Sequence, residues 1–156
     1  MAKAELLARI VAHLRLELDR LAQAALASHA DATDGENKAE NKYDTRGLEA
    51  SYLAHGQSKA AEEAADALAQ FQAMPLRDFG PGEIIALGAL VRLDDGNGYF
   101  IGPRAGGTEV EFEGGTILVI TPSSPLGRQL LGRRQGDSLQ LALGSRRTTV
   151  KITGVA

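Results

Sequence analysis

The sequence contains no cysteine, and aromatic residues make up only 4% of it. The lack of cysteine excludes disulfides, thiolate catalysis and cysteine-ligated zinc, and it is typical of a reducing compartment. With so few aromatic side chains, a core has to be built from Leu, Ile, Val and Ala. No apolar run approaches the roughly 18 residues of a membrane span, and charged residues interrupt the N-terminal apolar stretch. We therefore expect a cytoplasmic protein with no membrane segment.

Glycine and proline are scarce in one half of the chain. Residues 1–75 contain only three of the 18 glycines and no proline before Pro75, whereas residues 76–156 hold the other fifteen glycines and most of the Val, Ile and Thr. This contrast predicts a helical unit over 1–75 and a unit of short strands and turns over 76–156. The net charge of −3 argues against a general nucleic-acid binder, which would normally be basic.

The helical unit carries two apolar seams. One helix is predicted from about Lys3 to Ser28 and a second from about Glu40 to Phe71, with a polar tip over about 31–44 between them. Spacings of three and four residues define a heptad seam in each helix. The seam residues are Leu7, Val11, Leu14, Leu18, Leu21 and Ala25, then Ala50, Leu53, Ala60, Ala64, Ala67 and Phe71. Alanine facing leucine allows two helices to lie close together and antiparallel. This favours a monomeric hairpin. One arm of a larger bundle and a homodimeric coiled coil remain alternatives.

The second unit alternates short apolar runs with turn formers. Strands are predicted over 84–93, 99–101, 108–113, 116–120, 138–143 and 148–153, and a short helix begins at Ser124-Pro125. Pro125 suits the first turn of that helix, and Gly136-Asp137 suits the turn into the next strand. The pattern predicts an α+β fold: an N-terminal antiparallel coiled-coil helical hairpin, then an antiparallel β-sheet domain with one short helix.

The run ITPSSPLGRQLLGRRQGDSLQL, from Ile120 to Leu141, resembles the C-terminal signature of the Gre-type bacterial transcription factors. The signature elements here are Ser124-Pro125, Leu130-Leu131, Gly132-Arg133-Arg134 and Gly136-Asp137. The resemblance implies an FKBP-like C-terminal domain after a helical hairpin, and it extends to the tip, where the run Lys42-Tyr43-Asp44-Thr45 is similar to that of small Gre-like proteins.

The resemblance also implies a partner and a cofactor. Gre-type factors bind bacterial RNA polymerase and place the hairpin tip in its secondary channel, where tip carboxylates help to hold a catalytic Mg²⁺ beside the RNA 3′ end. The matching candidates are Glu36 and Glu40 as catalytic helpers, with Asp34 and Asp44 as further Mg²⁺ ligands shared with the polymerase. Mg²⁺ prefers such hard oxygen ligands. The candidate partner-binding residues are Lys42, Tyr43, Ser124, Pro125, Leu131, Arg133 and Arg134.

The tip departs from the cleavage-competent pattern, which has an aspartate three positions before a Glu-Asn pair. Glu40-Asn41 fits that pair, but the earlier position holds the neutral amide Asn37. Glu36 and Glu40 would still share one face if this segment is helical. Three interpretations stay open: stimulation of transcript cleavage, inhibition or regulation by occupying the channel, and a plain solvated loop. A Rnk-like interaction module is a further alternative, although such proteins have a shorter helical arm. No set of residues indicates a stand-alone enzyme.

Overall fold

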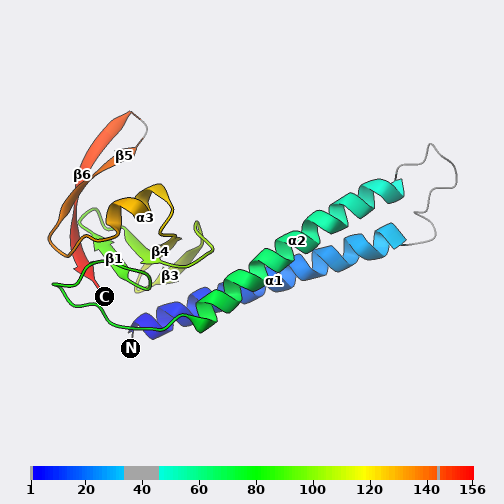
Figure 1. Cartoon of the computed structure of the whole chain (residues 1–156), viewed down its shortest axis with the longest axis horizontal. Coiled ribbons are helices and arrows are strands. Elements are labelled where there is room, and N and C mark those ends of the chain that lie inside the picture. The colour runs from blue at the N-terminus through cyan, green and yellow to red at the C-terminus, as the bar shows by residue number, and fades with distance from the viewer. Residues whose placement is uncertain (1, 34–45, 144) are drawn as a thin grey trace. The chain divides into compact units, whose positions relative to one another are not determined.

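The computed structural model of the chain describes residues 2–33, 46–143 and 145–156, and it describes side chains in these ranges outside 28–33, 46–55 and 143. Two long helices, α1 (Ala2–Thr33) and α2 (Arg46–Ala73), precede a sheet and the short helix α3 (Pro125–Leu130) (Figure 1). The chain forms two compact units. The helical unit is Ala12–Ala69, and the sheet unit combines Met1–Val11 with Gln70–Ala156.

The helical unit confirms the predicted hairpin. Helix α1 leaves the sheet unit after Val11 and α2 rejoins it at Gln70, so the two helices run in opposite directions. Leu14, Ala25 and Ala67 are buried, as the seams predict. Their burial is explained by the apolar stripe of one helix covering that of the other. Among the described residues, neither this pair nor α3 has the length and hydropathy needed to cross a membrane.

The first three turns of α1 differ from the predicted seam. Leu6 and Ile10 are fully buried there, whereas the predicted Leu7 and Val11 are only half-buried. The reason is that this stretch belongs to the sheet unit and not to the helical unit, so the packing of the sheet unit decides which helix face is covered. The heptad pattern therefore describes α1 only from Leu14 onward.

The sheet has six strands in the order β3-β4-β2-β1-β6-β5. Their bounds are β1 Leu90–Leu93, β2 Gly98–Ile101, β3 Glu109–Phe112, β4 Gly115–Ile120, β5 Ser138–Leu143 and β6 Arg146–Val155. All neighbouring strands are antiparallel except β2 and β4, which are parallel. The prediction of a fully antiparallel sheet is thus wrong for this pair. Strand β3 takes the edge and pairs only with β4, and this leaves β4 running in the same direction as β2.

The predicted strand over 84–93 is shorter in the structure, which has a strand only from Leu90 to Leu93. The residues before it bond elsewhere: the Ile85 N–H donates to the Arg133 carbonyl at 2.7 Å, and the Gly132 N–H donates to the Ile85 carbonyl at 3.0 Å. Gly88, with a φ of 89°, turns the chain before β1 begins. This apolar run therefore joins the end of α3 to the sheet, while the other predicted strands are confirmed within a few residues.

The end of α2 is held on the sheet by an aromatic contact. Phe71 is fully buried, and its ring centroid lies 6.3 Å from that of Phe100 in β2. A Cβ atom at Gly102, just after β2, would lie 2.6 Å from Phe71 Cζ and 2.9 Å from Val119 Cγ1. Only glycine leaves room for the ring at this distance, so the contact depends on the missing side chain.

The first turn of α1 is attached through a buried lysine. Lys3 has 4% of its surface exposed, and its ammonium group donates hydrogen bonds to the Arg77 carbonyl and, at 3.0 Å, to the Ala156 carbonyl. The same group lies 4.7 Å from the centroid of the Phe79 ring, a cation–π distance. Burial lowers the pKa of Lys3, and the carboxylate of Asp78 partly opposes that shift. The carbonyl partners explain how a charged group is accommodated there.

Gly102→Ala is expected to lower the free energy of unfolding by about 1–3 kcal/mol, because the added methyl group overpacks the site between Phe71 and Val119. Urea denaturation followed by circular dichroism measures the loss. Gly82→Ala is the matched control, since nothing lies within 4 Å of a Cβ at Gly82. Equal stability of the two variants would contradict the proposed role of the Phe71 contact.

Candidate functional site

The predicted tip residues lie outside the described part of the chain. These are Asp34, Glu36, Glu40, Lys42, Tyr43 and Asp44. Their roles in holding Mg²⁺ or contacting a partner stay predictions. Within the described residues there is no group of three or more His, Asp or Glu side chains that could hold a metal ion.

The predicted partner-binding residues of the C-terminal motif lie at α3 and the turn that follows it. Ser124 is the N-cap of α3: its hydroxyl accepts a hydrogen bond from the Gly127 N–H at 3.0 Å and donates one to the Thr121 carbonyl at 2.7 Å. Pro125 occupies the first helical turn, where a backbone N–H has no acceptor within the helix, so its absence loses no helical hydrogen bond. At Gly127, a Cβ would lie 2.0 Å from the Thr121 carbonyl oxygen. Ser124, Pro125 and Gly127 therefore form one compact turn.

The end of α3 returns the chain to the sheet. Leu130 is fully buried in the core, while Leu131 is half-buried at its margin. Gly132 has a φ of 82°, a left-handed conformation that glycine adopts without strain. The motif's leucines thus anchor α3, and its glycine sets the direction of the chain at the start of the basic pair.

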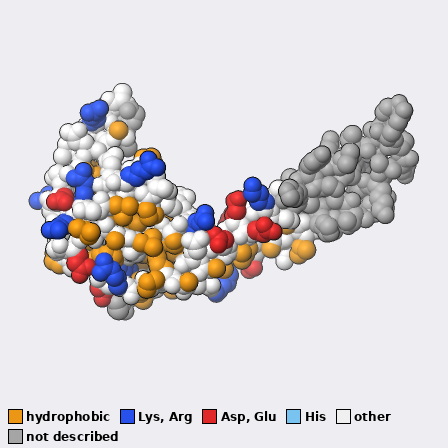
Figure 2. All heavy atoms as spheres, viewed as in Figure 1, with side chains coloured by type: hydrophobic (Ala, Val, Ile, Leu, Met, Phe, Trp, Pro, Cys, Tyr) orange, Lys and Arg blue, Asp and Glu red, His pale blue; other side chains and the backbone are white. Residues whose placement is uncertain are grey.

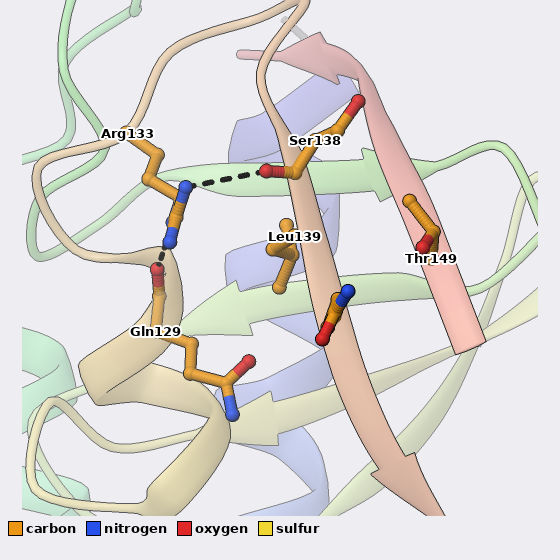
Figure 3. Close-up of a pocket in the computed structure, with 6 residues that line it drawn as sticks. Gln129, Arg133, Ser138, Leu139 and Thr149 are labelled. Atoms are coloured by element: carbon orange, nitrogen blue, oxygen red, sulfur yellow. Dashed lines mark hydrogen bonds between the residues drawn. The ribbon is translucent and has the colours of Figure 1, made fainter. Parts of the chain in front are cut away.

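The two arginines of the motif have different surroundings. Arg133 is half-buried: its Nε donates to the Gln129 carbonyl at 2.7 Å and its Nη1 to the Ser138 carbonyl at 3.3 Å. The Arg134 side chain is exposed, and its backbone N–H donates to the Asp137 carboxylate at 2.9 Å. Arg133 therefore bridges α3 and β5 (Figure 3).

Arg133 lies in a groove of about 540 Å³ between α3 and β5. The other lining residues are Gln129, Ser138, Leu139, Gln140 and Thr149. In Figure 3, α3 contributes Gln129 on one side of the groove and β6 contributes Thr149 beyond β5. Sequence reasoning found Arg133 but missed the other five. The alternation Ser-Leu-Gln-Leu predicts a strand over 138–141. The position of this strand at an edge of the sheet is visible only in the folded structure.

The C-terminal segment around the groove is strongly basic. Residues 124–156 contain six Lys and Arg and one acid, Asp137. Five of the six, all except Arg133, are exposed: Arg128, Arg134, Arg146, Arg147 and Lys151. Figure 2 shows Lys and Arg side chains spread over the visible face of the sheet unit, around a central area of hydrophobic side chains. Asp and Glu side chains also lie on this face, so the excess of basic side chains belongs to residues 124–156 and not to the whole face.

No family model and no curated protein sequence matches the chain. Several solved structures match the chain. GreA factor homolog 1 (Gfh1) of Thermus thermophilus is 23% identical over 94% of each chain, with a TM-score of 0.39. Gfh1 of Thermus aquaticus is 25% identical over 99% of this chain and 94% of that chain, also with a TM-score of 0.39.

A prokaryotic transcription elongation factor GreA/GreB from Nitrosomonas europaea is 19% identical over 59% of this chain and 78% of that chain, with a TM-score of 0.34. All three are Gre-type factors.

Ser124→Ala is expected to destabilise the sheet unit by about 1 kcal/mol, the typical cost of losing an N-cap hydroxyl. Thermal unfolding measures the effect. Ser123→Ala is the matched control, because the neighbouring exposed hydroxyl contacts only the Thr121 hydroxyl, at 3.3 Å. A Ser123→Ala variant as unstable as Ser124→Ala would argue against the capping role.

Proposed function

We propose that this chain is a Gre-type accessory factor that binds bacterial RNA polymerase and places its hairpin tip in the secondary channel. One observation carries the proposal. A two-helix hairpin and a sheet unit bearing the motif Ser124-Pro125 through Gly136-Asp137 occur in one chain, in the order that the resemblance implies. The factor acts as a monomer on the active site of the polymerase and has no complete catalytic site of its own.

The length of the helical unit supports this role. Residues 12–33 of α1 belong to it, and at about 1.5 Å per residue they extend for roughly 33 Å. Each helix buries one narrow apolar stripe, so the pair is slender. A pair of this length and width suits insertion into a deep channel. It also exceeds the short arm of a Rnk-like module.

The tip carboxylates supply the proposed chemistry. Glu36 and Glu40, with Asp34 and Asp44 near them, are hard oxygen donors of the kind that Mg²⁺ prefers. Mg²⁺ held jointly with the polymerase would activate water for hydrolysis of the RNA 3′ end. The chain's contribution is to bring oxygen ligands to a site where the polymerase already holds the nucleic acid, so its contact with nascent RNA is indirect.

The proposal has two versions, which differ in the consequence of having the neutral amide Asn37 at this position of the tip. If Glu36 and Glu40 suffice as ligands, the factor stimulates cleavage of backtracked RNA. If an aspartate is needed where Asn37 stands, the same insertion occupies the channel without stimulating cleavage, and the factor is an inhibitor or regulator. Both versions require binding to the polymerase, and they differ only in the chemistry at the tip.

Purified full-length protein is expected to bind core RNA polymerase and to change the cleavage rate of a stalled, backtracked complex. If it stimulates cleavage, Glu40→Gln is expected to reduce that stimulation by at least about tenfold, or about 1.4 kcal/mol in the barrier, since a metal ligand is lost. Binding to the polymerase is expected to be unchanged, because the substitution removes only a single charge at the tip. Single-turnover cleavage and a binding titration measure the two effects separately.

Glu62→Gln is the control, because this exposed glutamate lies in α2 outside the tip. Failure to bind core polymerase would disprove the proposal as a whole. Binding that slows cleavage, with no response to Glu40→Gln, would establish the inhibitory version and exclude the metal-holding one.

A further inference from the structure

Strand β5 is a free edge of the sheet. It is the last strand in the order and, among the described strands, pairs only with β6, in antiparallel register from Ser138 opposite Lys151 to Leu143 opposite Arg146. In such a pair, alternate residues direct their N–H and C=O groups toward the partner strand, and the residues between them direct these groups away from it.

The hydrogen-bond pattern identifies which residues of β5 direct their peptide groups outward. The Ile152 N–H donates to the Asp137 carbonyl at 2.8 Å, so position 137 bonds toward β6. The next carbonyl, that of Ser138, points away and accepts from Arg133 Nη1 at 3.3 Å. By the same alternation, the peptide groups of Gln140 and Ala142 face the open edge. Gln140 also lines the groove beside α3, so its edge groups lie where a ligand has room.

The opposite edge of the sheet is different. Strand β3 presents two acidic side chains, Glu109 and Glu111, and the Glu111 carbonyl already accepts a hydrogen bond at 2.7 Å from Arg9 of α1. Charged side chains and a covering helix are common ways of blocking a sheet edge. Of the two edges, the one along β5 is therefore the better suited to an added strand.

The surroundings of β5 favour an acidic polypeptide as the occupant. The exposed bases Arg146, Arg147 and Lys151 lie on β6 directly opposite residues of β5. The guanidinium group of Arg133 lies at the start of the open edge. Single-stranded nucleic acid also carries negative charge, but its bases are usually held by exposed aromatic rings. None of the aromatic side chains that the structure describes is exposed. An open backbone edge, in contrast, matches the main chain of an extended peptide.

We infer that the groove between α3 and β5 binds an extended acidic segment of a partner protein, which adds to the sheet as a strand beside β5. Outward peptide groups at Gln140 and Ala142 hydrogen-bond its main chain. Arg133 pairs with a carboxylate near one end of the segment, and apolar side chains of the segment lie on the face that carries Gln140 and the Thr149 methyl group. This surface belongs to the sheet unit alone, and it does not depend on what the hairpin tip does.

The test uses the full chain and a fluorescein-labelled seven-residue peptide of alternating glutamate and valine, with binding followed by fluorescence anisotropy. Saturable binding is expected. A peptide with lysine in place of glutamate is expected to bind at least about tenfold more weakly, because its charges are repelled. A glutamate–valine peptide methylated on alternate amide nitrogens is expected to lose binding to a similar degree, because it cannot form the strand hydrogen bonds.

Two variants at Gln140 separate the contribution of its backbone N–H to peptide binding from the contribution of its side chain. Gln140→Pro removes an outward N–H without removing a bond to β6, since proline is tolerated where the N–H faces away from the sheet. It is expected to weaken peptide binding by about tenfold. Gln140→Ala keeps the N–H and is expected to bind normally.

Arg133→Gln is expected to weaken peptide binding as well. Arg15→Gln, an equal charge change in the helical unit, is the control.

Unfolding curves of each variant show whether the sheet is intact. If Gln140→Pro fails to fold, the comparison of methylated and unmethylated peptides decides the question in the unaltered protein. Equal affinity for these two peptides would overturn the inference, as would equal binding by Gln140→Pro and Gln140→Ala. Binding of an eight-nucleotide single-stranded RNA in place of the acidic peptide would assign the basic surface to nucleic acid and would also overturn it.

Discussion

The packing of Phe71 on Gly102 and Phe100 is the contact on which the rest of the fold depends. It lies where α2 ends and the strands begin, and it buries the largest apolar side chain of the helix end against the sheet. A side chain at residue 102 would force the ring away. Lys3 makes the second attachment, through two backbone carbonyls, so both ends of the hairpin are held in the sheet unit by contacts that tolerate little change.

The C-terminal motif has a structural explanation that is independent of any partner. Ser124 caps α3, Gly127 allows its close approach to the Thr121 carbonyl, and Leu130 fills the core. Arg133 differs from these residues, since its guanidinium group bridges α3 and the open edge of β5 and remains half-exposed. The motif thus contains both a turn that builds the fold and charged groups that a partner can reach, among them Arg133 and the exposed Arg134.

Charge is divided between the two ends of the chain. Residues 1–75 hold 12 acids and eight bases, whereas residues 124–156 hold one acid and six bases. In the sequence, the acids between the helices suit a cation or a basic partner, and the exposed bases of β6 suit an acidic one.

The sequence by itself determined the two long helices and most strands, because these depend on local periodicity and on glycine and proline. It also pointed to the candidate acids between the helices, which lie outside the described residues. Only the tertiary structure decided that Leu6 and Ile10 are buried in place of Leu7 and Val11, since that stretch of α1 belongs to the sheet unit. Strand order likewise made β2 and β4 parallel and left β5 at an edge. Pairing between distant strands leaves no periodic trace in a sequence, so the groove beside Arg133 became visible only in the folded chain.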